Sequence, residues 1–212
     1  NYLKNKYLIG DGLEIGPGRY PYKKKNVIYV DKFPEHYPSM DSNKMIKADA
    51  SKLPFKDSYF DFLISAHCLE HCPDTILTLK EWIRVIKPGG NLFLILPHAE
   101  RTFDKGRKLT DLQHHIIDYK NKADIYDKNP LDEWEKISLP NAKPKWLTNK
   151  NTLNKDGSLN FKWMAENGKI HYHAWTQDEI AKLGQYLNLK VLFSSDYLPT
   201  REDSFIVVFN KI

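Results

Sequence analysis

The sequence predicts an α/β protein with a doubly wound, mostly parallel β-sheet and an inserted lid region after the fourth strand. Short runs of β-branched or apolar residues alternate with amphipathic stretches through the first half of the chain. The run 92–96 is wholly apolar, as is typical of parallel strands that are covered on both faces. The alternation resumes near the end of the chain with one further helix and two strands.

The individual elements can be placed from their patterns. Apolar residues three or four apart predict a helix over residues 75–86, and Lys87-Pro88-Gly89-Gly90 ends it because proline lacks an amide donor. Thr176 and Glu179 have the spacing of a capping box, which predicts a helix from there to about Leu187. Strands are expected at residues 12–16, 27–30, 60–65, 92–96, 191–194 and 205–209.

Length and composition favour a single globular domain over residues 1–212, and the cytoplasm as its location. The 32 Lys and Arg against 27 Asp and Glu are spread along the chain, which makes nucleic acid an improbable partner. No apolar run approaches the roughly 18 residues that span a bilayer, so membrane insertion is not expected. Cys68 and Cys72 share one segment, which favours a reducing compartment. The chain begins without Met, so we expect a short piece to precede it.

The stretch 97–175 departs from the alternating pattern. It contains several Pro, Trp and Tyr residues and many charges, with only weak periodicity. Long irregular stretches inside a compact domain are usually functional. We therefore expect an insertion that covers the sheet as a lid and forms the acceptor site, rather than an independent domain.

The turn after the first expected strand is rich in glycine. It reads Leu13-Glu14-Ile15-Gly16-Pro17-Gly18, and glycines there let the backbone pass close to a ligand. Asp31 ends the second strand, where an acid can accept both ribose hydroxyls of a nucleoside. Asp49, between Ala48 and Ala50, can accept the exocyclic amine of adenine. Each feature alone has a simpler explanation: the glycines as a tight turn, Asp31 as a solvated strand end and Asp49 as a loop residue. The order of the three features along the chain favours a nucleoside site.

Four more motifs downstream complete the pattern: Leu53-Pro54-Phe55, Phe60-Asp61, Leu69-Glu70-His71 and Lys87-Pro88-Gly89-Gly90. Over about residues 11–97 the chain resembles the type 11 family of class I methyltransferases. The resemblance implies S-adenosylmethionine as the cofactor, with Gly16 and Gly18 facing its methionine part. It also implies that Asp31 holds the ribose and Asp49 the adenine. The expected cofactor-binding set is completed by Glu14, Ala50 and His67.

The segment between the glycine turn and the second strand is unusually short. Only residues 19–26 are available, and Pro21 with three lysines disfavours the helix that the family usually has there. S-adenosylmethionine has no phosphates that need a helix N-terminus, whereas the pyrophosphate of NAD does. The short segment therefore argues against NAD.

The acceptor region is expected just after the fourth strand. A hydroxyl acceptor benefits from a base of near-neutral pKa, and His98 and His115 are the candidates. Arg101 and Arg107 can hold an anionic group, so we expect a small anionic acceptor such as a phosphorylated or nucleotide-linked sugar. Structural histidines and a solvated basic loop are the alternatives. Among His98, His114, His115, His171 and His173 no spacing such as His-x-x-x-His occurs, so the sequence predicts no metal site from these histidines.

Two other functions stay open at this point. A methyltransferase-fold binding subunit without catalysis would be free to lose Gly16, Gly18, Asp31 and Asp49, yet all four are present. An RNA methyltransferase would carry a basic face with interleaved aromatic residues. Lys143-Pro144-Lys145-Trp146 and Lys162-Trp163 have that character. The short glycine turn and the His-rich segment also resemble methyltransferases among surface-polysaccharide enzymes.

Overall fold

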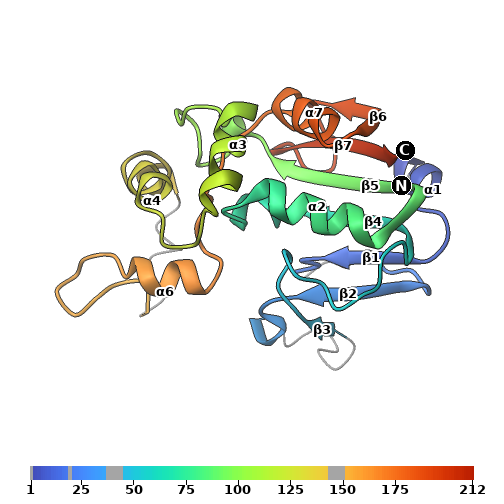
Figure 1. Ribbon diagram of the computed structural model, residues 1–212. Helices are drawn as coiled ribbons and strands as arrows, with labels where there is room; N and C mark the ends of the chain where they lie inside the picture. The colour runs from blue at the N-terminus through green and yellow to red at the C-terminus, as the bar shows by residue number, and fades with distance from the viewer. Residues whose placement is uncertain (1, 19–20, 37–44, 143–150) are drawn as a thin grey trace.

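The computed structural model describes residues 2–18, 21–36, 45–142 and 151–212. Its centre is a seven-stranded sheet in the order β3-β2-β1-β4-β5-β7-β6 (Figure 1). Strands β1 to β5 are parallel, and β7 runs antiparallel to both β5 and β6. The strands are β1 (Gly12–Ile15), β2 (Val27–Asp31), β3 (Met45–Lys47), β4 (Phe60–Ala66), β5 (Ile86–Pro97), β6 (Leu189–Ser195) and β7 (Ser204–Lys211). The predicted mostly parallel α/β sheet is confirmed.

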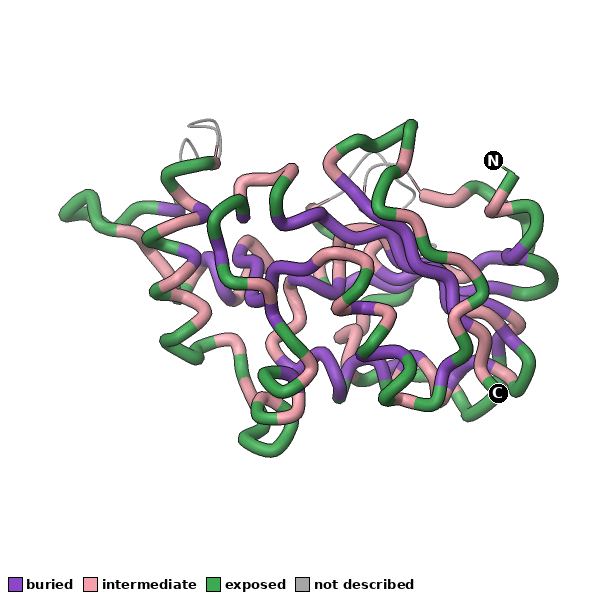
Figure 2. Tube along the Cα trace, turned by 90° about the horizontal axis from the view of Figure 1, so that it is seen from above, coloured by how far each residue is buried: buried purple, intermediate pink, exposed green. Residues whose placement is uncertain are grey.

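Helices cover the two faces of the sheet unequally. Helices α2 (Thr75–Val85) and α7 (Gln177–Tyr186) pack on one face, while α1 (Tyr2–Tyr7) is on the other. Thr176 begins α7 with the predicted capping box. The strands between them are the most buried part of the chain (Figure 2). The sequence analysis missed both α1 and β3, which are short.

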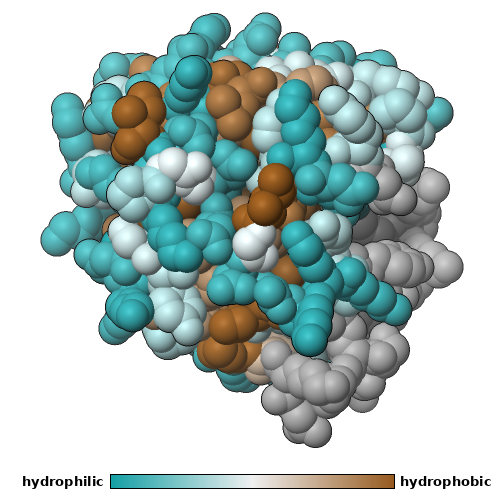
Figure 3. Space-filling model, turned by 90° about the vertical axis from the view of Figure 1, so that its right-hand side faces the viewer, coloured by the Kyte–Doolittle hydropathy of each residue, from teal (hydrophilic) through white to brown (hydrophobic). Residues whose placement is uncertain are grey.

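The described residues contain no helix that is both long and apolar enough to cross a membrane. Figure 3 shows the side on which the parallel strands begin and both termini lie. Apolar side chains on that side form small separate groups among hydrophilic ones. Scattered apolar residues of this kind are normal on a protein surface.

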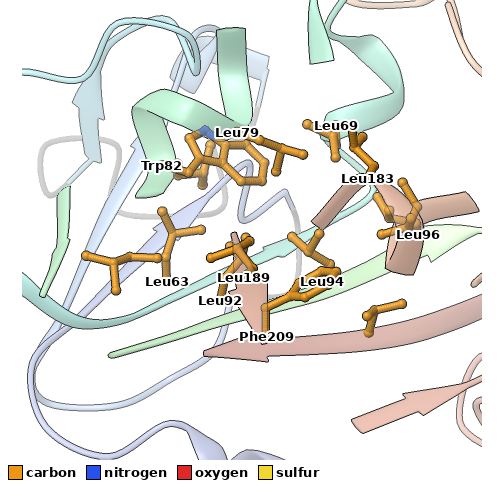
Figure 4. Packing of buried hydrophobic residues seen from close by; sticks show 14 of the residues in the cluster. Leu63, Leu69, Leu79, Trp82, Leu92, Leu94, Leu96, Leu183, Leu189 and Phe209 are labelled. Carbon is orange, nitrogen blue, oxygen red and sulfur yellow. The ribbon is translucent and has the colours of Figure 1, made fainter. Parts of the chain in front are cut away.

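Residues of β5 alternate between the two faces, and both faces are buried. Leu92, Leu94 and Leu96 point to the side of α2 and α7 and belong to the same cluster as Trp82 and Leu183 (Figure 4). Phe93, between them, belongs to the cluster on the opposite face. Burial on both faces explains why residues 92–96 lack the polar alternation of a half-exposed strand.

Strand β5 begins earlier than predicted. It starts at Ile86, directly after α2, and Lys87–Gly90 form part of it instead of a free turn. The pairing with β4 shifts there, because Ile86 lies opposite Phe60 while Asn91 lies opposite Phe62. A Cβ at Gly90 would come within 2.7 Å of the Asp61 carbonyl oxygen, so the close approach of the two strands requires glycine.

The described residues between β1 and β2 form no helix, as the sequence predicts. The buried carboxylate of Glu14 anchors this segment in place of a helix, because its Oε2 accepts the amide of Tyr22 at 2.7 Å. The Tyr29 hydroxyl donates to the Tyr22 carbonyl at 3.1 Å, and Lys24 Nζ donates to the Leu8 carbonyl at 2.5 Å. Side-chain hydrogen bonds therefore hold this segment against the sheet.

Residues 98–175, between β5 and α7, contain several short helical elements. They are η4 (Ala99–Arg101), α3 (Leu112–Asn121), α4 (Lys128–Glu133), η5 (Trp134–Ser138), α5 (Leu139–Asn141) and α6 (Phe161–Glu166). Helix α3 packs beside α2, whereas α4 and α6 extend beyond the ends of the strands (Figure 1). A separate apolar cluster around Trp134, Met164 and Tyr172 holds this part together. We call residues 98–175 the insertion; its action as a lid stays a prediction.

Replacing Glu14 by Gln tests the buried carboxyl on β1. Burial raises the pKa of Glu14 to about 7. Its pKa in an unfolded chain is about 4.3, so the carboxyl is less costly to the folded state when protonated. Stability from this group is therefore greatest below pH ~4.3 and is lost as the pH rises through about 7. We expect Glu14→Gln to stabilise the fold by about 1–3 kcal/mol at pH 8 and to have little effect at pH ~4.

Urea unfolding of both proteins at the two pH values measures this difference. Gln keeps an oxygen that can accept the Tyr22 amide, so the anchor itself is preserved. The exposed Glu135 supplies the control, because Glu135→Gln should give the same small change at both pH values. A Glu14→Gln effect that does not change with pH would contradict this account.

Candidate cofactor site

A cavity of about 390 Å³ lies at the carboxyl ends of β1, β2 and β4, and the insertion forms its outer wall. In doubly wound sheets this edge is where ligands bind. The lining from the sheet side includes Ile15, Gly16, Asp31, Phe33, Ala48, Asp49, Ala50 and His67. The lining from α2 and the insertion includes Asp74, Leu77, Thr78, Ala123, Asp124, Ile125, Ala165 and Gly168. The volume and mixed lining suit a nucleoside-sized ligand.

Asp31 is the acidic group best placed to hold a sugar. It ends β2, is 9% exposed, and accepts the Phe33 amide on Oδ1 at 2.7 Å. Burial raises the pKa of Asp31, and that hydrogen bond offsets only part of the effect. Two ribose hydroxyls that donate to this carboxylate would supply the missing hydrogen bonds. The local chemistry therefore fits the ribose of S-adenosylmethionine.

Asp49 lies in the same lining but is held differently. Its Oδ1 accepts the amide and hydroxyl of Ser51 at 2.9 and 2.8 Å, and its Oδ2 pairs with Lys32 Nζ at 2.8 Å. Burial alone would raise the pKa of Asp49, but the Lys32 and Ser51 contacts outweigh it and lower the pKa. An adenine amine would therefore meet an ionised carboxylate with a half-exposed lysine beside it. Ala50 is next to it in the lining.

The two glycines of the turn have different surroundings. Gly16 lines the cavity with a φ of +66°, and a Cβ there would come within 2.8 Å of the Cys68 side chain. Gly18 has a φ of +57° and no such neighbour, and it is outside the lining. Glu14 is outside the lining as well, because its carboxylate holds the Tyr22 amide. Of the three, only Gly16 has a position that can contact the cofactor directly.

His67 lines the cavity at the end of β4 in a left-handed conformation, with a φ of +52°. Its Nε2 lies 2.8 Å from the Ser204 hydroxyl, which itself donates to Asp203 at 2.7 Å. Nε2 therefore carries the proton. Burial lowers the pKa of His67 to about 3, so the ring is neutral at physiological pH. A neutral ring suits a position beside the positively charged sulfonium.

His98 lies outside this lining, so the geometry does not favour its role as the general base, which stays a prediction. Its Nδ1 accepts the amide of Glu100 at 3.1 Å, and its Nε2 lies 2.9 Å from Asp196 Oδ1. Arg101 binds the same carboxylate through Nη1 at 2.9 Å and also donates to the Asp196 carbonyl. Both side chains thus hold the loop between β6 and β7, and neither is free for an acceptor.

His115 is the buried residue of α3 and is also outside the cavity lining. Its Nε2 accepts the indole N–H of Trp175 at 3.0 Å, so the proton is on Nδ1. Burial lowers the pKa of His115 to about 3. The nitrogen that a general base would use is occupied, and the predicted catalytic role of His115 is not supported.

Arg107 is 4% exposed and links parts of the insertion. Its guanidinium donates to the carbonyls of His171 and Tyr172 at 2.9 and 3.0 Å. It also pairs with Asp104 at 3.1 Å and Glu133 at 3.0 Å. The guanidinium is therefore already used in the fold, which disfavours the binding of an anionic acceptor by Arg107, and that role stays a prediction.

Several cavity residues were missed by the sequence analysis. Phe33 follows Asp31 by two positions, and an aromatic residue so close to the expected ribose-binding acid was an available signal. Cys68 and Cys72 also line the cavity, and the structure has them as free thiols. The contributions of residues 123–125 and 165–168 carry no local sequence signal, because only the fold of the insertion brings them here.

Comparison with known proteins agrees with this geometry. Residues 13–94 match the type 11 methyltransferase domain family. Demethylmenaquinone methyltransferase of Staphylococcus aureus is 41% identical over 66 residues, which are 31% of this chain and 27% of that protein. The matched segment thus spans only about a quarter of that relative's length.

Solved structures resemble nearly the whole chain. One is a methyltransferase of Thermotoga maritima, described as a possible histamine N-methyltransferase (TM-score 0.54, 18% identity, 99% of this chain and 86% of that one). Another is a methyltransferase of Methanosarcina mazei (TM-score 0.54, 18% identity, 100% and 98%). At these identities the likeness shows the fold. The match over residues 13–94 is to a family of methyltransferase domains, and it supports S-adenosylmethionine as the cofactor.

Proposed function

We propose that this protein transfers a methyl group from S-adenosylmethionine to a small-molecule acceptor. The observation that carries the proposal is the cavity at the carboxyl edge of the sheet, lined by Gly16, Asp31 and Asp49. S-adenosylmethionine supplies the electrophilic methyl group when it is bound. Asp31 would hold the ribose and Asp49 the adenine amine, while Gly16 leaves room for the methionine part.

The rest of the cavity supports an acceptor site between the cofactor and the insertion. Asp124 and Ile125 come from the connection between α3 and α4, and Asp74 comes from the start of α2. Their contribution is to position an acceptor and exclude water from the reacting atoms. Because Arg101 and Arg107 are engaged elsewhere, the proposal specifies a small acceptor without specifying its charge.

The alternative functions receive less support from the described residues. Trp163 packs into the apolar cluster of the insertion, and Lys162 lies 4.0 Å from Glu166. This pair is thus not the free aromatic–basic face that RNA binding would use. The second such pattern, residues 143–146, lies outside the described residues. A binding subunit without catalysis is separated from an enzyme by the transfer experiment below.

The transfer experiment supplies methyl-labelled S-adenosylmethionine to the protein with a set of small acceptors. The resemblance to surface-polysaccharide enzymes places phosphorylated and nucleotide-linked sugars first in that set, followed by free amines and phenols. Formation of S-adenosylhomocysteine that depends on one acceptor would support the enzyme. Tight cofactor binding without transfer to any acceptor would favour the binding subunit, and transfer to RNA alone would favour the third function.

Asp31→Asn tests the assignment of the ribose site. The variant removes the charge but keeps the carbonyl oxygen that accepts the Phe33 amide. A hydrogen bond to a charged group contributes about 1.5–3 kcal/mol. Since 1.4 kcal/mol is a factor of ten, we expect S-adenosylhomocysteine to bind about 10–100-fold more weakly. Isothermal titration calorimetry measures the ratio.

The exposed Asp132 on α4 offers a matched control, since Asp132→Asn removes an equal charge away from the cavity lining. It should leave the affinity within about twofold of the wild type, as expected for a screened surface charge. Equal affinities of the Asp31→Asn variant and the wild type would remove Asp31 from the cofactor site.

Hydrogen–deuterium exchange tests whether the insertion closes the cavity. The amides of residues 123–125 and 165–168 lie beside the lining, so a bound ligand should slow their local opening. We expect S-adenosylhomocysteine to protect these segments while β6, at the far edge of the sheet, exchanges as before. Protection confined to residues 15–50 would show that the insertion takes no part in binding the cofactor.

A further inference from the structure

Glu70 is a fully buried carboxylate at the centre of η3 (Leu69–His71). Neither of its carboxylate oxygens has a hydrogen-bond partner among the described residues. Leaving a charged group buried without a partner is among the most costly arrangements in a protein. Such a group points to a missing ligand that would interact with it.

Two histidines face this carboxylate. His71 Nδ1 lies 2.8 Å from the Ile170 carbonyl, so this nitrogen carries the proton and donates it. His171 Nδ1 lies 2.6 Å from Asp104 Oδ2 and donates in the same way. In both rings Nε2 is left with its lone pair. Histidines that bind metals are oriented in just this manner, with the other ring nitrogen donating to a carbonyl or carboxylate.

Backbone contacts hold the three side chains together. The Tyr172 amide donates to the Glu70 carbonyl at 2.8 Å, which joins η3 to the segment 170–175 of the insertion. The rings of His71 and His171 lie 4.8 Å apart at an angle of 74°. One potential ligand atom from each of Glu70, His71 and His171 lies within 4.8 Å of the other two.

These separations are too long for hydrogen bonds but match ligands around a metal. His71 Nε2 lies 3.9 Å from Glu70 Oε1. Zinc binds imidazole nitrogen and carboxylate oxygen at about 2.0–2.2 Å, which places two ligands of a tetrahedral site about 3.3–3.6 Å apart. The His71–Glu70 pair would need to contract by only a few tenths of an ångström around an ion, and the atom from His171 lies within 4.8 Å of both.

We infer that Glu70, His71 and His171 form a binding site for one divalent transition-metal ion of the zinc type. Two imidazoles and one carboxylate are a ligand set that such ions prefer. Asp104 acts as a positioning residue, because it fixes the ring of His171. The sequence predicts no metal here, since residues 70 and 171 are far apart in the chain and only the return of the insertion brings them together.

The site opens toward the cofactor cavity. His71 is part of the cavity lining and its side chain is 27% exposed, which provides a path for an ion. His67 Nδ1 lies 3.6 Å from Glu70 Oε1 and is a possible fourth ligand. A remaining coordination position would face the cavity, where an ion polarises an acceptor hydroxyl and lowers its pKa. This role rests on the proposed methyl transfer, whereas binding of the ion does not.

The test is a titration of the chelator-treated protein with Co²⁺ and Zn²⁺. We expect one equivalent of Co²⁺ to give visible absorption bands of a low-coordinate nitrogen and oxygen site, and Zn²⁺ to displace it. Glu70→Gln and His71→Ala should each weaken Zn²⁺ binding more than about tenfold, since even second-shell partners contribute 10–100-fold. Circular dichroism and thermal unfolding show that each variant is folded.

His114→Ala is the matched control. His114, Asp118 and His173 form a second cluster that could hold an ion, and His114 is not in contact with Glu70. Zn²⁺ affinity that is unchanged in Glu70→Gln and His71→Ala, or lost in His114→Ala, would overturn the inference. Absence of any binding by the folded wild type would overturn it too. Because S-adenosylhomocysteine binding is measured separately, neither result would bear on the cofactor site.

Discussion

The buried carboxylate of Asp104 determines how the insertion meets the sheet. It is 1% exposed and accepts hydrogen bonds from His171 at 2.6 Å, Ser138 at 2.7 Å and Arg107 at 3.1 Å. Burial alone would raise the pKa of Asp104, but the contacts with His171 and Arg107 outweigh it and lower the pKa. Removing one partner of such a buried pair typically costs about 3–5 kcal/mol. The three segments around Asp104 are therefore fixed together.

This network positions the outer wall of the cavity. The segment 170–175, which Asp104 holds through His171, makes backbone hydrogen bonds to two parts of the sheet edge. The Tyr172 amide donates to the Glu70 carbonyl, and the Ala99 amide donates to the Trp175 carbonyl. The side of the cavity that we propose for the cofactor belongs to β1, β2 and β4, and the side proposed for the acceptor belongs to the insertion. Because these backbone hydrogen bonds join the two sides, they would hold an acceptor at a defined position relative to the cofactor.

The sheet could be predicted because its signals are local. Apolar runs, the capping box at Thr176 and the glycine turn each depend on neighbouring residues, and they gave most strands and both long helices that cover the sheet. Met45–Lys47 was missed because three residues are too few to show a period. The proposed cofactor residues Asp31 and Asp49 were predicted from local signals too. Asp31 ends a strand, and Asp49 lies in the short motif Ala48-Asp49-Ala50.

The acceptor side could not be predicted in that way. His98, Arg101, His115 and Arg107 were assigned from residue type and nearness to β5, yet each is used by a partner distant in the chain. Asp196 is 95 residues from Arg101, and Trp175 is 60 from His115. Sequence spacing does not reveal which polar side chains are consumed by long-range hydrogen bonds, and the same limit concealed the cluster around Glu70.

A crystal structure of the protein with S-adenosylhomocysteine tests the central claim most directly. The account predicts the ribose hydroxyls at Asp31, the adenine beside Asp49 and Ala50, and the homocysteine part along Gly16. The sulfur should point toward the side of the cavity that the insertion closes. A nucleoside bound elsewhere, or an adenine seated between the insertion and α2 with Asp31 unoccupied, would contradict the account.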